Sequence, residues 1–373
     1  MRNRIAELLL FLLPLTLLLG ERPVFKVTGI PFYAFEVLTL LLVISCYSMW
    51  RTGGMARLRA LPAVFRWGGA LLLLGLLISV SVAGVQGEAL GAAKAWFIMP
   101  LLLLVTIVAS AMSVRTLVWG IVATALAQTL YGFALLPAQQ EMRMIGTFSS
   151  PNFYAASVVP ALFLAYGFTR REKWLVMAVL LVGILASQSL GGMVGLIAGA
   201  LYVVAMASRK KKSAGIMIGI MVVMALIGGA LAYKRFSNNP RSSLASRQEI
   251  WQVALRIGDQ HPVTGIGLRN FDNEYLKAVP YVTTDPIEWN VPEPHNLYLA
   301  FWLDLSAVGL VAMLLIMGGA LAYGGAAAVT MAVLLAHGLV DTPIFKLELA
   351  VLFWLYVTII LSRGGRSKRD LVR

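Results

Sequence analysis

Charged side chains are scarce in this sequence of 373 residues. Asp, Glu, Lys and Arg together make up 13% of it, against about 25% in a typical soluble protein. Hydrophobic residues make up 59%, and the mean hydropathy is +0.81. Because so few charges cannot cover a globular surface, the composition excludes an ordinary soluble domain. It predicts an all-α polytopic membrane protein.

Cysteine and histidine are almost absent as well. The single cysteine, Cys46, lies in an apolar run, so no disulfide can form within the chain and no cysteine-based metal cluster is possible. The three histidines are far apart in the sequence and lack the spacing of metal ligands. The acidic residues do not supply a clear ligand cluster either. We therefore expect neither a metal site nor a cofactor.

Long apolar runs dominate what is present. A membrane helix needs about 20 apolar residues to cross about 30 Å of hydrocarbon, and twelve such segments can be traced, several of them somewhat short. No small-residue cleavage site follows the first segment, so it is interpreted as a retained helix. The predicted segments are 6–20, 32–50, 68–85, 92–110, 117–136, 153–168, 174–186, 191–207, 214–232, 297–317, 326–340 and 347–361.

The basic residues predict the orientation. With the N-terminus assigned to the cytoplasm, 19 of the 31 Lys and Arg residues fall in cytoplasmic segments and five in short outer loops. This asymmetry follows the positive-inside rule, so both termini are predicted to be cytoplasmic in a bacterial inner membrane. The net charge of +14 then faces anionic lipid headgroups, and nucleic acid is not an expected partner. Lys94, near an outer helix end, could meet a lipid phosphate.

The chain divides into three predicted regions. Residues 1–232 hold nine transmembrane helices, residues 233–296 form a periplasmic loop with amphipathic helices, and residues 297–373 hold three transmembrane helices and a basic cytoplasmic tail. A loop of this length with its own structure is usually functional. Within it, Leu244, Trp251, Ala254 and Leu255 are spaced to form one apolar helix face, with Arg247 predicted on another face.

Four polar sequence blocks follow one another along the chain. They are Arg143-x-x-Gly146-Thr147-Phe148-x-x-Pro151-Asn152; Arg247-x-x-Ile250-Trp251 with His261-Pro262-x-x-Gly265-Ile266-Gly267-x-x-Asn270-Phe271; His295-Asn296-Leu297-Tyr298-Leu299 with Asp304; and His337-x-x-x-Asp341. Taken in order, these blocks resemble the O-antigen ligase and polymerase superfamily. The chain departs from the family pattern at two places: Ser306 replaces a glycine that is usual eleven residues after the histidine of the third block, and Ser189-Leu190-Gly191 replaces a common Ser-Arg-Gly.

The resemblance implies a GT-C-like glycosyltransferase that takes a glycan from undecaprenyl pyrophosphate and passes it to an acceptor hydroxyl at the periplasmic face. Arg143 and Arg247 would bind the pyrophosphate, because the guanidinium group binds phosphate oxygens bidentately and stays charged. His295 would be the base, since its ordinary pKa is near neutrality. Direct displacement would invert the anomeric carbon. The expected partners are the lipid-linked donor, a glycolipid or glycan acceptor such as a lipid A–core sugar, and membrane lipids.

Supporting roles and rival functions remain open at this point. Asn296, and alternatively His295 itself, is placed to cap the next helix. His337 and Asp341 are one helical turn apart and able to hydrogen-bond, either orienting a helix end or assisting the site. Polymerase and protein O-oligosaccharyltransferase share the motifs. A scaffold protein would not need this ordered set, and a lipid-linked glycan transporter usually shows paired halves and polar sites at the membrane midplane.

Overall fold

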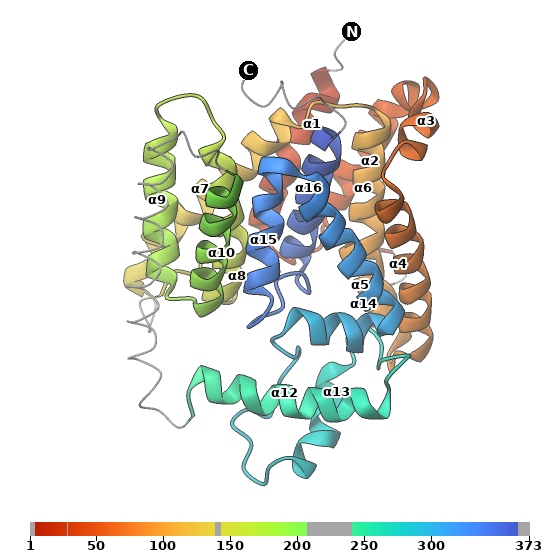
Figure 1. Ribbon diagram of the computed structural model, residues 1–373, viewed down its shortest axis with the longest axis vertical. Helices are drawn as coiled ribbons and strands as arrows, with labels where there is room; N and C mark the ends of the chain where they lie inside the picture. Colours follow the sequence, from red (N-terminus) through yellow and green to blue (C-terminus); the bar gives the residue numbers. More distant parts are fainter. Residues whose placement is uncertain (1–3, 28, 139–142, 207–240, 365–373) are drawn as a thin grey trace.

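The computed structural model describes residues 4–27, 29–138, 143–206 and 241–364 (Figure 1). The predicted ninth segment at 214–232, the start of the outer loop and the tail beyond residue 364 lie outside these residues. The described chain is mostly helical, and helices occupy the other eleven predicted apolar segments. Among the described residues, five helices are long and apolar enough to cross a membrane: Ala34–Arg51, Ala63–Val82, Gln86–Ala109, Arg115–Leu135 and Leu297–Tyr323. The total of twelve crossings stays a prediction.

Apolar helices and one small hairpin make up the N-terminal half. A short π-helical turn, Lys94–Ile98, joins α5 to α6. The elements are α1 (Arg4–Leu15), η1 (Thr16–Leu19), β1 (Phe25–Val27), β2 (Ile30–Phe32), α2 (Ala34–Arg51), α3 (Gly54–Arg59), α4 (Ala63–Val82), α5 (Gln86–Ala93), η2 (Lys94–Ile98), α6 (Met99–Ala109), α7 (Arg115–Leu135), η3 (Leu136–Ala138) and α8 (Pro151–Tyr166).

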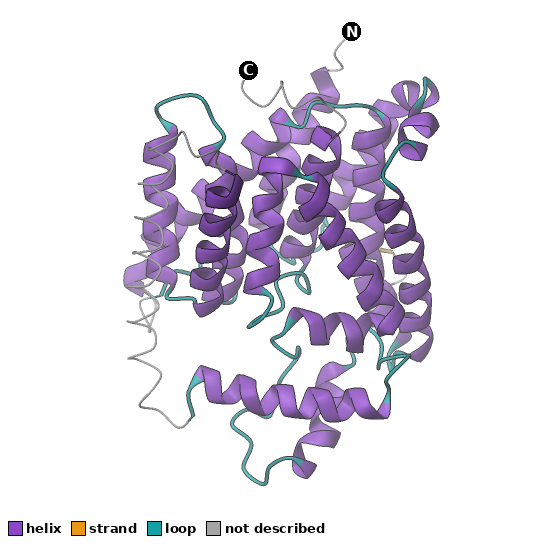
Figure 2. Cartoon of the chain, viewed as in Figure 1, coloured by secondary structure: helices purple, strands orange, loops and turns teal. Residues whose placement is uncertain are grey.

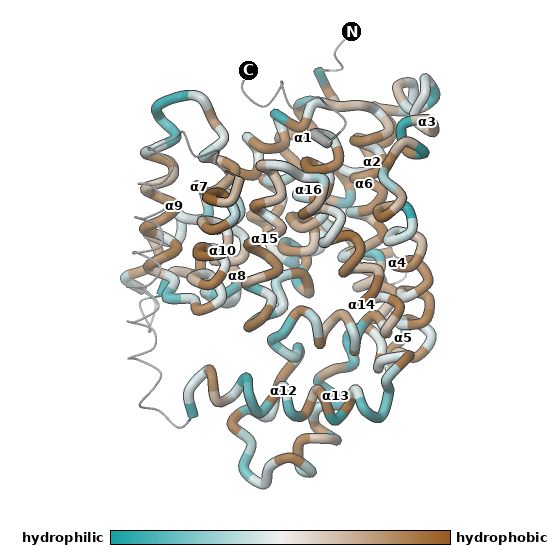
Figure 3. Tube along the Cα trace, in the orientation of Figure 1, coloured by the Kyte–Doolittle hydropathy of each residue, from teal (hydrophilic) through white to brown (hydrophobic). Residues whose placement is uncertain are grey.

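The C-terminal half interposes two polar helices between apolar ones. The elements are α9 (Lys173–Ser187), α10 (Leu190–Met206), α12 (Ser243–Gln260), α13 (Phe271–Ala278), η4 (Val279–Tyr281), α14 (Leu297–Tyr323), η5 (Gly325–Ala328), α15 (Val329–His337) and α16 (Leu347–Gly364). The apolar helices form one bundle, and α12 with α13 lies across one end of it (Figure 2). Hydropathy follows this division: the bundle helices are largely apolar, and α12 and α13 alternate polar and apolar residues (Figure 3).

The two ends of the bundle differ in which segments lie there. The start of α1, helix α3 and the loop between α8 and α9 lie at the end away from α12 (Figure 1). α3 carries Arg57 and Arg59, and the α8–α9 loop carries Arg170 and Arg171. The described basic clusters therefore gather opposite the α12–α13 layer, as the charge pattern predicts for the cytoplasmic side.

The α12–α13 layer has a small core of its own. Ile250, Ala254 and Ile257 of α12 pack with Phe271 and Tyr275 of α13, and all five are buried. These α12 positions recur at helical spacing, which produces one buried face.

The predicted apolar face of α12 is wrong in part. Leu244 and Leu255 are 40% and 49% exposed, and Arg247 lies on the buried face, 7% exposed. The helix turns this face toward α13 and the first turns of α14, so the arginine is drawn into the protein together with Ile250. Burial of a guanidinium group is costly unless its hydrogen-bond donors are paired, so the hydrogen-bond partners of Arg247 determine whether this position is stable.

A glycine turn fastens this layer to the bundle. Gly265 and Gly267 have φ of +63° and +84°, a region that favours glycine. A Cβ on Gly265 would lie 2.2 Å from the Leu303 carbonyl oxygen, and one on Gly267 would lie 2.5 Å from that of Ser79. The turn therefore contacts the backbones of α14 and α4, and any side chain there would separate them.

The predicted uninterrupted helix over 297–317 is interrupted. Ser306 has φ 74° and ψ 169°, a combination almost confined to glycine. Its Oγ accepts a hydrogen bond of 3.3 Å from Gly309 N, which starts the second part of α14. In Figure 1 the first part lies across the end of the bundle and the second part runs along the bundle. The residue that departs from the family pattern thus lies at a break that a glycine would fit better.

Lys94 does not remain free for a lipid phosphate. Its Nζ lies 2.7 Å from Glu36 Oε2, donates to the Pro31 carbonyl at 2.5 Å and lies 4.0 Å from the centre of the Phe32 ring. Glu36 is fully buried. The pair holds the β1–β2 hairpin against the beginning of the π-helical turn.

Candidate functional site

Arg247 is held in the second turn of α12 by contacts on three sides. Its Nε donates to the Val340 carbonyl at 2.6 Å, and its Nη1 donates to the Ser243 carbonyl at 3.0 Å and to the Ser243 hydroxyl. Its Nη2 lies 3.7 Å from Asp341 Oδ2, too far for a good hydrogen bond. The guanidinium is thus oriented by the protein, while Nη2 keeps donor capacity for a ligand.

His295 lies immediately before α14 and faces Asp341. Its Nδ1 is 3.2 Å from Asp341 Oδ1, so Nδ1 carries the proton of the neutral ring and Nε2 is left to accept one. Its backbone adopts φ 46°, and the Trp251 indole donates to its carbonyl at 3.3 Å. Positive φ in a non-glycine residue is costly and is often found at functional sites.

Asp341 contacts both Arg247 and His295. It is 1% exposed, and its Oδ1 also accepts from Thr342 N at 2.9 Å. Burial would raise its pKa, but the His295 hydrogen bond and the nearby charges of His295 and Arg247 hold the pKa of Asp341 well below its usual range. Burial lowers the pKa of His295, yet the hydrogen bond and charge of Asp341 outweigh it, so the His295 pKa lies above its ordinary value.

Asn296 is the N-cap of α14, as the sequence predicted. Its Oδ1 accepts from Tyr298 N at 3.0 Å and Leu299 N at 3.1 Å, and its Nδ2 donates to the Leu339 carbonyl at 3.0 Å. The cap is therefore Asn296 and not His295. By bonding to Leu339, it also fixes the start of α14 beside the loop that carries Asp341.

His337 is close to these groups but does not hydrogen-bond with Asp341. α15 ends at His337, so the two side chains are not on successive turns of one helix. Within the described residues neither ring nitrogen of His337 has a hydrogen-bond partner, and the side chain is 1% exposed. A Cβ on Gly191 would lie 2.6 Å from His337 Nε2. The glycine of the Ser189-Leu190-Gly191 block thus leaves room for this ring.

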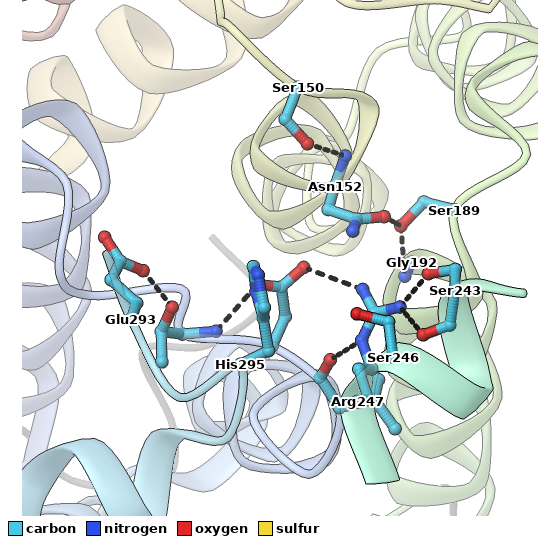
Figure 4. A network of polar contacts seen from close by, with 12 residues as sticks. Ser150, Asn152, Ser189, Gly192, Ser243, Ser246, Arg247, Glu293 and His295 are labelled. Atoms are coloured by element: carbon cyan, nitrogen blue, oxygen red, sulfur yellow. Dashed lines mark hydrogen bonds and ion pairs between the residues drawn. The ribbon is translucent and has the colours of Figure 1, made fainter. Parts of the chain in front are cut away.

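Two further helix N-termini come near this group of residues. Ser189 Oγ donates to Asn152 Oδ1 at 2.7 Å and accepts from Gly192 N at 3.1 Å, and Ser150 caps α8 by accepting from Asn152 N at 3.1 Å. Figure 4 shows the starts of α8, α10 and α12 around Arg247. Helix N-termini carry partial positive charge and favour anions, so they add to the effect of the arginine.

Arg143 has a different environment. Its Nε donates to the Ser187 carbonyl at 3.1 Å and its Nη2 to the Gln188 carbonyl at 3.4 Å, so it covers the C-terminal carbonyls of α9. A cation at a helix C-terminus is a stabilising arrangement. The structure therefore brings Arg247, His295 and Asp341 into contact, with Asn296 and His337 beside them, and gives Arg143 a contact with the α9 end.

Glu293 was not predicted as a site residue. It is 6% exposed, its Oε2 accepts from the Thr342 hydroxyl, and burial raises its pKa to about 7. The sequence feature that could have identified Glu293 is its position between two prolines, two residues before His295. An isolated acidic residue, however, shows no spacing typical of ligand-binding residues. Only the fold places Thr342, next to Asp341, against it.

The arrangement combines a histidine base with a fixed cation and three helix N-termini. Within the described ranges no three His, Cys, Asp or Glu side chains come together as a metal ligand set. The chemistry offered by the residues present is proton removal by His295 beside a positive site for an anionic group.

Comparison with known proteins agrees with this chemistry. A family model described as O-antigen ligase matches residues 175–317, which run from α9 into α14 and contain Arg247 and His295. Arg143 and Asp341 lie outside the matched segment. No curated protein matches the chain in a sequence search. The match to residues 175–317 supports the O-antigen ligase superfamily, a family of ligase- and polymerase-type glycosyltransferases.

Proposed function

We propose that this protein is an inverting, metal-independent glycan ligase. It moves a glycan from undecaprenyl pyrophosphate to a hydroxyl group of a lipid A–core sugar at the periplasmic face of the inner membrane. The observation that carries the proposal is the contact of Asp341 with both His295 and Arg247. One carboxylate thereby sets the distance between a base and a phosphate-binding cation.

The step requires a proton acceptor and a stabilised leaving group. His295 Nε2 takes the proton of the acceptor hydroxyl, the hydroxyl oxygen bonds to the anomeric carbon, and the bond between that carbon and the phosphate oxygen breaks. The electron pair leaves with the pyrophosphate. Arg247 Nη2 and the N-termini of α8, α10 and α12 favour the charge that develops there. A single displacement inverts the anomeric configuration.

Asp341 supports this step in two ways. Its hydrogen bond to His295 Nδ1 orients the ring and selects the tautomer with a free Nε2. Its negative charge also stabilises the protonated histidine that forms as the hydroxyl is deprotonated. His337 and Asn296 help to position these groups. His337 fills the space next to Gly191, and Asn296 caps α14.

Transfer by the purified full-length chain tests the proposal. The assay contains a polyprenyl-pyrophosphate-linked glycan, lipid A–core acceptor and excess EDTA. We expect the glycan to appear on the acceptor with the opposite anomeric configuration. Longer polyprenyl-linked glycans would instead indicate a polymerase, and transfer to a protein acceptor supplied in a parallel assay in place of lipid A–core would indicate an oligosaccharyltransferase. Activity that disappears with EDTA and returns with Mg²⁺ or Mn²⁺ would refute the metal-free mechanism.

A further inference from the structure

A cavity with charged residues in its lining lies beside the site described above. It has a volume of about 560 Å³, within the range of about 300–1,000 Å³ common for small-molecule sites. Its walls come from the end of η1 with the residues that follow, from the loop between Arg143 and α8, and from the start of α16. These segments are distant in the sequence and meet only in the folded chain.

Two walls of this cavity continue into the site. The segment that contains Asp341 and Thr342 also supplies Lys346 to the cavity, and Glu348 follows at the start of α16. The first turn of α8 places Asn152 against Ser189 and the next residue, Phe153, in the cavity wall. The cavity and the site therefore share the loop before α16 and the first turn of α8.

One residue of the cavity wall is linked to the site by charge. Glu293 and Arg247 lie on opposite sides of His295 (Figure 4), and the positive charge of Lys346, in the cavity wall, acts on Glu293. Displacement needs the attacking oxygen and the leaving group on opposite faces of the anomeric carbon. A donor held at Arg247 thus leaves the Glu293 side for the incoming hydroxyl.

The lining suits a sugar better than a lipid chain or a phosphate. Glu21 and Glu348 provide carboxylates, and Arg22 and Lys346 provide cations, so the net charge is balanced. Within the described residues no ion pair joins these four groups, and Glu348 is only 6% exposed. A lipid chain would leave the buried Glu348 carboxylate unpaired, and a phosphate would meet two carboxylates. Sugar hydroxyls both donate and accept hydrogen bonds and can satisfy both kinds of group.

Aromatic side chains complete the lining. Tyr131, Phe148 and Phe153 border the cavity, and Lys346 Nζ lies 5.3 Å from the centre of the Phe153 ring. Rigid aromatic rings bury large areas of a ligand at low cost in conformational entropy. We infer that this cavity is the acceptor subsite, which holds the sugar whose hydroxyl attacks the donor. The inference rests on the proposed function and names the substrate of the same site.

Two isosteric variants test the subsite in the full-length protein: Glu348→Gln and Lys346→Met. Each removes a charge-assisted hydrogen bond to the sugar, so we expect the KM for a core-oligosaccharide acceptor to rise about tenfold or more. The KM for the polyprenyl-pyrophosphate donor and the kcat at saturating acceptor should be unchanged. Lys26→Met, on the exposed hairpin strand β1 outside the cavity, is the matched control and should leave both KM values unchanged.

Binding of the free core oligosaccharide separates the two proposals. Saturation-transfer NMR should show contact with the wild-type protein and with His295→Ala, and loss of contact in Glu348→Gln. Unchanged acceptor KM and binding in both cavity variants, with normal transfer by the wild type, would overturn the subsite alone. A rise in donor KM instead would assign the cavity to the donor glycan and also overturn it. Absence of transfer by the wild type, with cavity-dependent binding intact, would refute the proposed reaction and not the sugar site.

Discussion

At the scale of single residues, His295 can be tested separately from its neighbours. His295→Ala should lower transfer roughly 10²–10⁴-fold, the usual contribution of a general base, while donor binding remains near normal because the base acts on the acceptor hydroxyl. Transfer per folded molecule and thermal stability should be measured together. A well-folded variant with near wild-type transfer would remove the catalytic role from this histidine, and His337 would become the next candidate.

The pH dependence of transfer should report the His295–Asp341 contact. The raised pKa of His295 means that the ring is protonated, and inactive as a base, up to a pH above its ordinary 6.5. Activity should therefore rise with pH through an acid limb located above 6.5. In Asp341→Asn the carboxylate is lost, and burial and the Arg247 charge then lower the pKa.

The acid limb of Asp341→Asn should consequently move to lower pH, and the plateau rate should fall because the ring is less well oriented. The measurement is kcat against pH for the two proteins, with circular dichroism at each pH as a control for folding. An acid limb at the same pH in both would mean that another group titrates.

Conservative substitution separates the two arginines. Arg247→Lys retains a positive charge but loses the fork that contacts Val340, Ser243 and the ligand, so transfer should fall about 10²-fold. Arg143→Lys should mainly reduce thermal stability, because Arg143 donates to carbonyls at the end of α9. Kinetics and thermal denaturation of both variants decide this. An equal loss of transfer per folded molecule in Arg143→Lys would support its predicted role at the pyrophosphate.

At the scale of elements, the break in α14 places the site. The first part of α14 begins at the Asn296 cap, contacts the glycine turn through Leu303, and ends at Ser306. If the helix continued straight from residue 307 toward its N-terminus, His295 would be carried away from Asp341. The unusual backbone of Ser306 is therefore part of how the two residues meet.

Substitutions at Ser306 should have opposite signs. A residue in this backbone region costs about 1–3 kcal/mol. Glycine relieves this strain but gives back about 0.5–1 kcal/mol through its flexibility when unfolded and a few tenths of a kcal/mol through the lost bond to Gly309 N. Ser306→Gly should raise the melting temperature. Ser306→Ala keeps the backbone strain and loses the hydrogen bond to Gly309 N, worth about 1 kcal/mol. This variant should therefore lower the melting temperature. Thermal denaturation in one detergent compares them, and equal melting temperatures would contradict the strain argument.

At the scale of the whole molecule, the charge asymmetry and the fold predict the same orientation. With Cys46 replaced by alanine, a cysteine at the exposed Lys277 of α13 should react with a membrane-impermeant thiol reagent in intact spheroplasts. A cysteine at the exposed Arg171, in the loop between α8 and α9, should react only after permeabilisation. Labelling of Arg171→Cys in intact spheroplasts would reverse the orientation, and no labelling of Lys277→Cys would place the site away from the outer face.

Much of the molecule follows from local features of the sequence. The apolar runs predict the bundle helices, because any segment of about 20 apolar residues must satisfy its backbone internally in a membrane. The cap at Asn296 and the turn at Gly265 and Gly267 depend on residue type and a few neighbours. Arg247, His295 and Asp341 could be selected from motif blocks, and they do come into contact.

Other features required the tertiary structure. Nothing in the local sequence shows that Arg143 covers the end of α9, since it donates to carbonyls 44 and 45 residues away. The buried face of α12 was predicted from apolar spacing, but packing against α13 and α14 turned Arg247 inward with Ile250. Glu293 gained importance only because the fold brings Thr342 to it. These outcomes depend on which surfaces meet, and periodicity does not carry that information.

The sequence by itself determined the class of protein and the residues available for its chemistry. These are an apolar helical bundle, basic clusters predicted to face one side, and one polar segment with arginine and histidine. Hydropathy and charge act residue by residue, so they can be read without the fold. The tertiary structure alone decided the pairings, because hydrogen bonds and ion pairs form over about 3 Å between segments far apart in the chain. It assigned Asp341 to His295 and Arg247 instead of to His337, and it formed a cavity from η1, the loop before α8 and α16.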